Sequence, residues 1–171
     1  MSDSLTGTAL ILFSHGSVLC GAGLALEEHA DRLRQSGQFA QVEIGYMNYS
    51  MPTFADAVAR CYGAGYRNIL VLPFFLVPGY FVTNSLPQHL AGARESFPDI
   101  EFTVAMAIGF DESLADALID AALDPLPASA WRDDLAAASK SCRANPACPL
   151  YGTPDCPRAP EPGTPVRLAV E

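Results

Sequence analysis

The segment Asn68-Ile-Leu-Val-Leu-Pro-Phe-Phe75 carries the strongest strand pattern in the chain. A short, continuous apolar run of this kind is typical of a parallel strand that is covered on both faces. Thr8-Ala-Leu-Ile-Leu-Phe13 is a second run of the same type. Two further strands are expected at residues 42–47 and 101–107, and Pro73 is expected to lie where its own strand ends.

A segment with helical spacing of its apolar residues follows each expected strand. These helices are expected at residues 22–36, 54–61, 86–97 and 111–123, with a long loop at residues 76–84. Strands that alternate with helices predict a parallel sheet with right-handed crossovers. The sequence therefore predicts an α/β fold, a four-stranded parallel flavodoxin-like half-sheet with helices on both faces.

Composition excludes several classes of protein. The 171 residues include 10 Lys and Arg against 19 Asp and Glu, a net charge of −9, and half of the residues are apolar. Such a chain can build a packed core, which argues against a disordered or fibrous protein. The acidic balance argues against a general nucleic-acid binder, and no apolar run approaches the roughly 20 residues that span a membrane. The first seven residues contain no basic residue and do not resemble a signal peptide, so a cytoplasmic location is expected.

The chain is expected to divide near residue 124. Nine of its 14 prolines lie in residues 125–165, whereas 11 of its 13 glycines precede residue 110. Proline at this density interrupts both helices and sheets. We therefore expect an α/β domain at residues 1–123 and an irregular, Pro- and Cys-rich extension at residues 124–171.

His15 is the strongest candidate for a functional side chain. Ligands of open parallel sheets bind at the carboxyl ends of the strands, and His15 directly follows the first strand, beside Gly16. A neutral imidazole there can bind a divalent metal or accept a proton near pH 7. The structural alternative is a histidine that caps the next helix or bonds to a loop carbonyl. A histidine phosphatase is disfavoured because Ser14, not Arg, precedes His15.

The other two histidines are weaker candidates. His29 falls on the apolar stripe of the first helix and is expected to be half-buried and structural. His89 follows Pro87 in the third helix and is expected to face either the strand ends or, more often for such a position, the solvent.

The segment Val77-Pro-Gly-Tyr-Phe-Val-Thr83 is apolar and aromatic where a surface loop is usually polar. At a ligand-binding edge, Tyr80 and Phe81 would form a wall for a large, flat ligand. Tyr46, Met47 and Tyr49 add apolar character at the neighbouring strand end. The alternative is that these aromatic rings pack under the C-terminal extension or in a subunit interface.

Three stretches of this chain together resemble the sirohydrochlorin chelatases, the small class II chelatases of the CbiX/SirB type. They are Leu12-Phe-Ser-His-Gly-Ser17, Ile69-Leu-Val-Leu-Pro-Phe-Phe-Leu-Val-Pro-Gly79 with Leu86-Pro87 after it, and Pro52 shortly after the second strand. The resemblance covers about residues 8–121. It implies insertion of Co²⁺ or Fe²⁺ into sirohydrochlorin, a tetrapyrrole, on the way to cobalamin or sirohaem.

The resemblance also implies site residues. His15 matches the family's first histidine, a metal ligand and proton acceptor, while Phe81 stands at the position of its second histidine and Asn48 at that of its glutamate. Phenylalanine cannot bind a metal, and an amide oxygen is a poorer ligand than a carboxylate. His89 is a speculative replacement ligand. The expected substrate-binding residues are Ser14, Tyr46, Asn48, Tyr80 and Phe81.

Three of the five cysteines, Cys142, Cys148 and Cys156, cluster in the extension, and prolines follow the last two. Three thiolates could hold an iron–sulfur cluster, or zinc with a fourth ligand from elsewhere. The alternative is three reduced free thiols.

Three functions stay open at this point: a chelatase, a non-catalytic protein that binds a tetrapyrrole or metal in a degenerate chelatase site, and an interaction protein. A homodimer is expected, because a half-sheet forms only one side of a cleft for a flat ligand.

Overall fold

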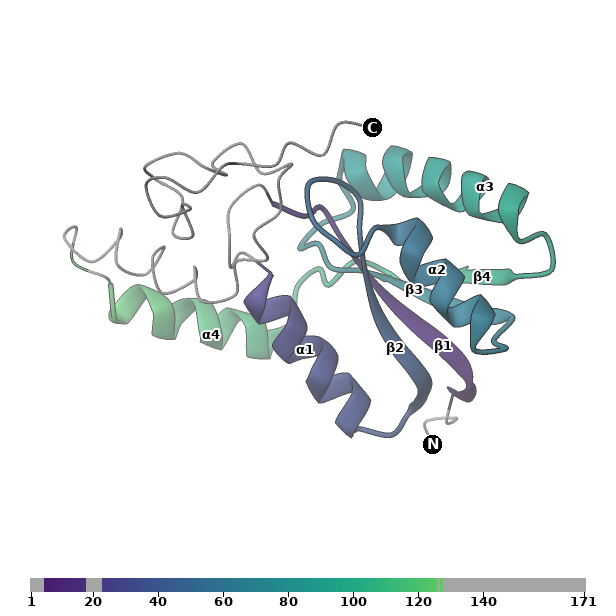
Figure 1. The fold of residues 1–171 in the computed structure, drawn as a ribbon. Helices are drawn as coiled ribbons and strands as arrows, with labels where there is room; N and C mark the ends of the chain where they lie inside the picture. Colours follow the sequence, from purple (N-terminus) through teal and green to yellow (C-terminus); the bar gives the residue numbers. More distant parts are fainter. Residues whose placement is uncertain (1–4, 18–22, 126, 128–171) are drawn as a thin grey trace, which may run out of the picture.

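The computed structural model describes residues 5–17, 23–125 and 127 (Figure 1). Four strands alternate with helices along the described chain, as the sequence predicts. The elements are β1 (Leu5–Ser14), α1 (Leu24–Gln35), β2 (Phe39–Tyr46), α2 (Phe54–Gly63), β3 (Asn68–Pro73), a π-helical turn η1 (Phe81–Ser85), α3 (Leu86–Ser96), β4 (Glu101–Val104) and α4 (Glu112–Leu123).

All four strands are parallel and lie in the order β2-β1-β3-β4. In the centre of the sheet, Leu12 pairs with Ile44 on one side and with Leu72 on the other. The expected parallel α/β sheet is therefore confirmed. The order places β1 between two neighbours, so the carboxyl end of β1 lies in the middle of the sheet edge.

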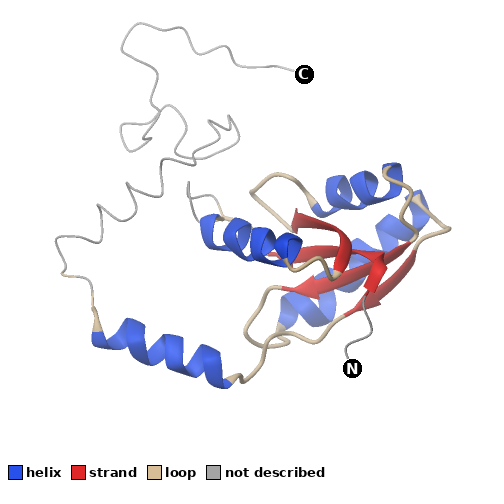
Figure 2. Ribbon diagram, turned by 90° about the horizontal axis from the view of Figure 1, so that it is seen from below, coloured by secondary structure: helices blue, strands red, loops and turns tan. Residues whose placement is uncertain are grey.

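Alternate residues of β1 supply two separate cores. Leu10 and Leu12 face α1, where they pack with Leu26 and Ala30. The opposite face of the sheet, which includes Ile11, Phe13 and Val71, packs against α2 and α3. Helices thus cover both faces (Figure 2), as expected. Every one of these named side chains is less than 4% exposed.

The burial of two single residues, His29 and Cys61, bears on their chemistry. His29, expected to be half-buried, is exposed, with its ring 5.4 Å from that of Phe74. Cys61 of α2 is fully buried in the core, and this burial, with a smaller effect of Glu43, raises the pKa of its thiol to about 12.

β3 ends at Pro73, as the proline predicts, although the apolar run continues to residue 75. β4 ends at Val104, earlier than the expected residue 107. The amide of Ala105 donates to the carbonyl of Val71. The next bond of this ladder would require an amide hydrogen on Pro73, which proline lacks. The proline therefore ends both strands.

The prediction of a loop at residues 76–84 is wrong for its second half. Phe81–Ser85 forms the π-helical turn η1, which continues directly into α3. Pro87 lies in the first turn of α3, where its missing N–H is tolerated. Phe81 is consequently held at the start of a helical segment rather than in an irregular loop.

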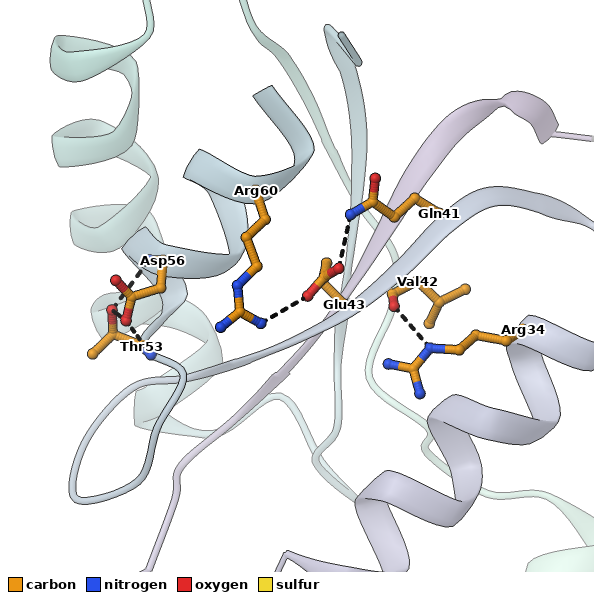
Figure 3. A network of polar contacts seen from close by, with 7 residues as sticks. All are labelled: Arg34, Gln41, Val42, Glu43, Thr53, Asp56 and Arg60. Carbon is orange, nitrogen blue, oxygen red and sulfur yellow. Dashed lines mark hydrogen bonds and ion pairs between the residues drawn. The ribbon is translucent and has the colours of Figure 1, made fainter. Parts of the chain in front are cut away.

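A polar network fixes α2 against β2 (Figure 3). Thr53 and Asp56 form a capping box: each side chain bonds to the backbone of the other residue. These hydrogen bonds from Thr53 lower the pKa of Asp56. Arg60 reaches back from α2 to Glu43 of β2, at 3.2 Å. The start of α2 is therefore set, and with it the end of the loop that follows β2.

Two further hydrogen bonds that involve side chains lie on the outer strand β2. Gln41 donates to Glu43 at 2.7 Å, and Nε of Arg34 in α1 donates to the carbonyl of Val42 at 3.1 Å (Figure 3).

The last helix, α4, stands apart. None of its residues is buried, and it projects away from the sheet in Figure 2. Within the described residues, no helix has the length and apolar character needed to cross a membrane.

Candidate functional site

His15 lies at the carboxyl edge of the sheet, immediately after β1. Backbone hydrogen bonds hold this end of the chain on the loop after β2: the amide of Met47 donates to the carbonyl of Ser14 at 2.8 Å, and the amide of Asn48 donates to that of His15 at 3.0 Å. On the other side, the amide of Phe74 donates to the carbonyl of Phe13 at 2.8 Å. The backbone of His15 is thus fixed from both neighbouring strand ends.

Gly16 allows the segment after β1 to approach the loop after β2 closely. Its φ of 81° lies in the left-handed region, and a Cβ placed on it would collide with the backbone carbonyl of Asn48. The loops can therefore approach this closely only with glycine at the position. Asn48, which stands where the family resemblance implies a glutamate, is exposed beside His15.

The ring of His15 is half-buried between two aromatic rings. The ring of Phe81 lies 4.6 Å away and the ring of Tyr49 lies 5.8 Å away, measured between centroids. Nδ1 of His15 lies 3.0 Å from the carbonyl oxygen of Gly16. Because a carbonyl only accepts, Nδ1 carries the hydrogen in this bond, and the neutral ring keeps its lone pair on Nε2. The structural alternative for His15 was a bond to a loop carbonyl, and the ring does make one. This bond uses only Nδ1, so Nε2 is not engaged by it.

Exposed apolar side chains form an apolar surface, of which Tyr49 and Phe81 lie beside His15. Its members are contributed by the loops after β2 and β3 and are exposed: Tyr49, Met51, Leu76, Val77, Tyr80 and Phe81. Tyr80 is 67% exposed and Phe81 39%, and their rings meet edge to face at 6.1 Å. The rings of Tyr80 and Phe81 are therefore present at the surface where the sequence analysis expects a wall for a flat ligand.

Tyr46 is not part of this exposed wall. It points to the α1 side of the sheet, is 4% exposed, and packs with Leu26. With Ser14, Ser17 and Ser50 it lines a cavity of about 100 Å³ beside the start of α1. This cavity is far too small for a tetrapyrrole. Ser14 and Tyr46 are thus brought together, but away from the surface formed by Tyr80 and Phe81.

Tyr49 takes the place expected for Tyr46. It is 64% exposed and has φ 59°, an uncommon conformation for a residue other than glycine. From the sequence, only its apolar character was evident. Its position just beyond a strand end was the available signal, but the left-handed turn that brings its ring to His15 could not be seen in the sequence.

His89 lies on α3, neither in solvent nor beside His15. Its half-buried ring packs at 5.7 Å from Phe13 and 6.0 Å from Phe54, and burial lowers its pKa. Within residues 5–17 and 23–125, no three His, Cys, Asp or Glu side chains gather as a metal site. Cys142, Cys148 and Cys156 lie outside the described residues.

The parallel sheet agrees with the outcome of comparison with known proteins. The model of the CbiX family matches residues 9–124, about two thirds of the chain. The chain belongs to the CbiX family. The matched region includes His15, Phe81 and all of the sheet except the first four residues of β1.

Two curated relatives are identical to this CbiX protein at similar levels, 28% and 29%. A sirohydrochlorin cobaltochelatase of Methanocaldococcus jannaschii is 28% identical over 138 residues, which cover 67% of this chain and 96% of the relative. The chloroplastic sirohydrochlorin ferrochelatase of Arabidopsis thaliana is 29% identical over 111 residues, or 65% of this chain. The match spans only 49% of the length of the plant protein.

Solved structures show the same architecture. A cobalamin (vitamin B12) biosynthesis CbiX protein from Marinobacter aquaeolei VT8 has a TM-score of 0.57 and 25% identity, and the match covers 66% of this chain and 92% of that one. The sirohydrochlorin chelatase SirB from Bacillus subtilis, solved with cobalt, has a TM-score of 0.62 and 22% identity. That match covers 66% of this CbiX chain and 48% of SirB, so the likeness to SirB concerns the fold of about half of its length.

Proposed function

We propose that this protein inserts Co²⁺ or Fe²⁺ into sirohydrochlorin or a related tetrapyrrole, as part of cobalamin or sirohaem synthesis. The names of the curated relatives, cobaltochelatases and a ferrochelatase, support this substrate class. The observation that carries the proposal is the position of His15, whose Nε2 lone pair is available at the carboxyl edge of the sheet beside exposed aromatic rings.

The reaction requires a base and a transient metal ligand. A tetrapyrrole loses two pyrrole N–H protons when a divalent metal enters, and a neutral imidazole can accept a proton near pH 7. Imidazole also binds both Co²⁺ and Fe²⁺. The hydrogen bond from Nδ1 to the carbonyl of Gly16 orients the ring of His15 and sets its tautomer, so Nε2 serves in either role.

The apolar surface suits the flat face of the macrocycle. The rings of Tyr49 and Phe81 lie beside His15, and the ring of Tyr80 contacts that of Phe81. Aromatic rings stack favourably on flat conjugated systems at centroid separations of roughly 4.5–7 Å. A macrocycle resting on these rings would present its central nitrogens to His15.

A second function, binding of a tetrapyrrole or metal without catalysis, is favoured by one specific contact. The neighbour of His15 at 4.6 Å is the phenyl ring of Phe81, which can neither bind a metal nor carry a proton. Asn48 is likewise a neutral side chain. His15 would therefore have to act as both base and ligand in a chelatase, whereas binding alone would not require a second group.

The test is an anaerobic reaction of the full chain with sirohydrochlorin and Co²⁺, followed by visible absorbance. We expect the absorbance of the metallated macrocycle to appear faster with the protein than in its absence. His15→Ala should abolish this acceleration without changing the melting temperature. His29→Ala, which removes an exposed histidine elsewhere, is the matched control and should react like the wild type. A spectrum of bound but unmetallated pigment would support the binding function and contradict the chelatase.

Two further proposals concern location and cofactor. The cytoplasm stays a prediction from the sequence. An iron–sulfur cluster or zinc held by Cys142, Cys148 and Cys156 stays a prediction from their spacing. Iron and zinc analysis of anaerobically purified protein tests it, and background levels of both metals would contradict it.

A further inference from the structure

All arginines of the described structure lie at one edge of the sheet. Because each helix runs from the carboxyl end of one strand to the amino end of the next, the last turn of a helix lies at the amino edge. Every arginine in a described helix is in such a last turn, and the remaining one directly precedes β3. The described residues contain no lysine, and their arginines are Arg32, Arg34, Arg60, Arg67 and Arg94.

His15 lies at the opposite, carboxyl edge of the sheet. β3 has six residues, so about 20 Å of strand separate the two edges. The Debye length at physiological salt is about 8 Å, which leaves the arginines little effect at the carboxyl edge. Three of them are also engaged already: Arg34, Arg60 and Arg67 form ion pairs with Asp31, Glu43 and Asp99. The described arginines therefore do not neutralise a ligand bound beside His15.

The described charges at the carboxyl edge are negative. Asp111 is the N-cap of α4, two residues beyond Gly109, whose amide donates to the carbonyl of Leu76 in the apolar surface at 2.8 Å. The helices that start at this edge have acidic residues in their first turns: Glu27, Asp56 and Glu112. Such carboxylates stabilise helix starts through the helix dipole, which explains their presence without a ligand. They nevertheless place like charge beside an anion that binds at this edge.

The apolar surface itself supplies only neutral contacts. None of its members is charged, and the neighbouring Asn48 and Ser50 are neutral as well. Aromatic and aliphatic side chains of this kind bind a flat conjugated face by stacking and by burial of apolar area. A carboxylate on the rim of the same ligand meets no cation of the described residues there. Because the chain has a net charge of −9, a polyanion is also repelled on its approach.

We infer that the site selects tetrapyrroles through their ring face and prefers those with few carboxylates. The preference rests on the proposed function, tetrapyrrole binding beside His15, and narrows its ligand class. Sirohydrochlorin carries many carboxylates, so a related macrocycle that has lost some of them by decarboxylation is the better ligand. The cause is electrostatic, and salt therefore weakens the preference.

Two metal-free porphyrins test this preference, because they share one ring system and differ in charge. Uroporphyrin carries eight carboxylates and coproporphyrin carries four. Binding to the full chain is measured by the fluorescence anisotropy of the porphyrin, which requires no metal insertion. We expect coproporphyrin to bind about tenfold more tightly in 10 mM salt, where the Debye length is about 30 Å. In 100 mM salt, where this length is about 10 Å, the affinity for uroporphyrin should rise and the difference should shrink.

Matched variants place one new cation at each edge of the sheet. Val77→Arg adds it to the apolar surface, at a side chain that is 65% exposed. Gln38→Arg adds the same charge at the amino edge, at an exposed residue just before β2. Val77→Arg should tighten uroporphyrin binding about three- to fivefold, the effect of a good surface ion pair, and coproporphyrin binding less. Gln38→Arg should leave both affinities unchanged.

A third variant locates the porphyrins on the protein. Tyr80→Ser removes an exposed ring from the apolar surface and should weaken the binding of both porphyrins. Unchanged binding in this variant would mean that the porphyrins bind elsewhere and would overturn the inferred preference of this site.

Other outcomes separate the preference from the function on which it rests. Uroporphyrin binding that is tighter than coproporphyrin binding, and is weakened by salt, would overturn the preference and assign the carboxylates to basic residues outside the described part of the chain, such as Lys140 and Arg143. Equal effects of Val77→Arg and Gln38→Arg would contradict a local cause at the apolar surface. If neither porphyrin binds, the proposed tetrapyrrole function itself fails, and the preference fails with it.

Discussion

The ring of Phe81 lies 4.6 Å from the ring of His15. The position at which the family resemblance implies a second histidine is therefore in contact with the first, and η1 holds it there. A histidine at position 81 would therefore place a second imidazole beside that of His15.

Phe81→His is expected to create a two-histidine metal site. A second imidazole beside His15 should tighten Co²⁺ binding at least tenfold, or about 1.4 kcal/mol, because two nitrogen ligands replace one. Titration of Co²⁺ monitored by calorimetry measures the change. Tyr80→His moves the imidazole by one residue, to a side chain that no ring contact joins to His15, and should have much less effect. Equal affinities for the two variants would show that the neighbourhood of His15 and Phe81 does not form a site.

Gly16→Ala should disturb the site and the fold together. The new Cβ would meet the carbonyl of Asn48, and the φ of 81° is unfavourable for any residue with a side chain, by roughly 1–2 kcal/mol before the collision is counted. Urea denaturation measures the loss of stability. Gly37→Ala is the control, since Gly37 also has positive φ, at 64°, but has open space around its Cβ position. A loss no larger than that of Gly37→Ala would mean that the two loops can separate without cost.

His89 should make the protein less stable in weak acid. Burial lowers its pKa in the folded state below the unfolded value of about 6.5. The unfolded chain then binds a proton first as the pH falls, so the stabilisation present above pH 6.5 is lost as the pH drops through the folded pKa. The free energy of unfolding should fall between pH 7.5 and pH 5.5, and His89→Leu should reduce this slope. An unchanged slope in the variant would assign the acid sensitivity to other groups.

Thr53→Ala should cost about 1 kcal/mol of stability at neutral pH, the usual value for loss of a helix N-cap. The same change removes the hydroxyl hydrogen bond that is the largest cause of the lowered pKa of Asp56, while the backbone N–H of residue 53 can still donate to this carboxylate. A lowered carboxylate pKa stabilises the fold above the unfolded value and loses this effect as the pH falls through the folded pKa. The difference between variant and wild type should therefore shrink toward pH 3, as urea denaturation at both pH values would show. Ser96→Ala, at the exposed end of α3, serves as the control.

The centre of the sheet could be predicted because β1 and β3 contain short apolar runs, which are typical of strands covered on both faces. Leu70 and Val71 illustrate this, since both faces of β3 carry apolar side chains. The position of His15 follows from the strand that precedes it. The apolar runs and the position of His15 after the first of them can be recognised from neighbouring residues alone.

The remaining features depend on contacts between distant segments. Tyr46 and Tyr49 are similar in the sequence, yet the strand register buries one on the α1 side and a left-handed turn exposes the other beside His15. The outward course of α4 is set by hydrogen bonds from residues 108 and 109 to the segment after β3. No periodicity in the helix itself indicates on which surface it will pack.

The side chains along β2 have a consequence for the protein at high concentration. An outer strand normally offers free backbone groups to a strand from another molecule, and repeated addition of this kind is how cross-β fibres grow. On β2, Arg34 already occupies the carbonyl of Val42, and Glu43 with Arg60 places charge along the same strand. Strand addition at β2 would have to displace an arginine and desolvate an ion pair, so this end of the sheet is protected against fibre growth.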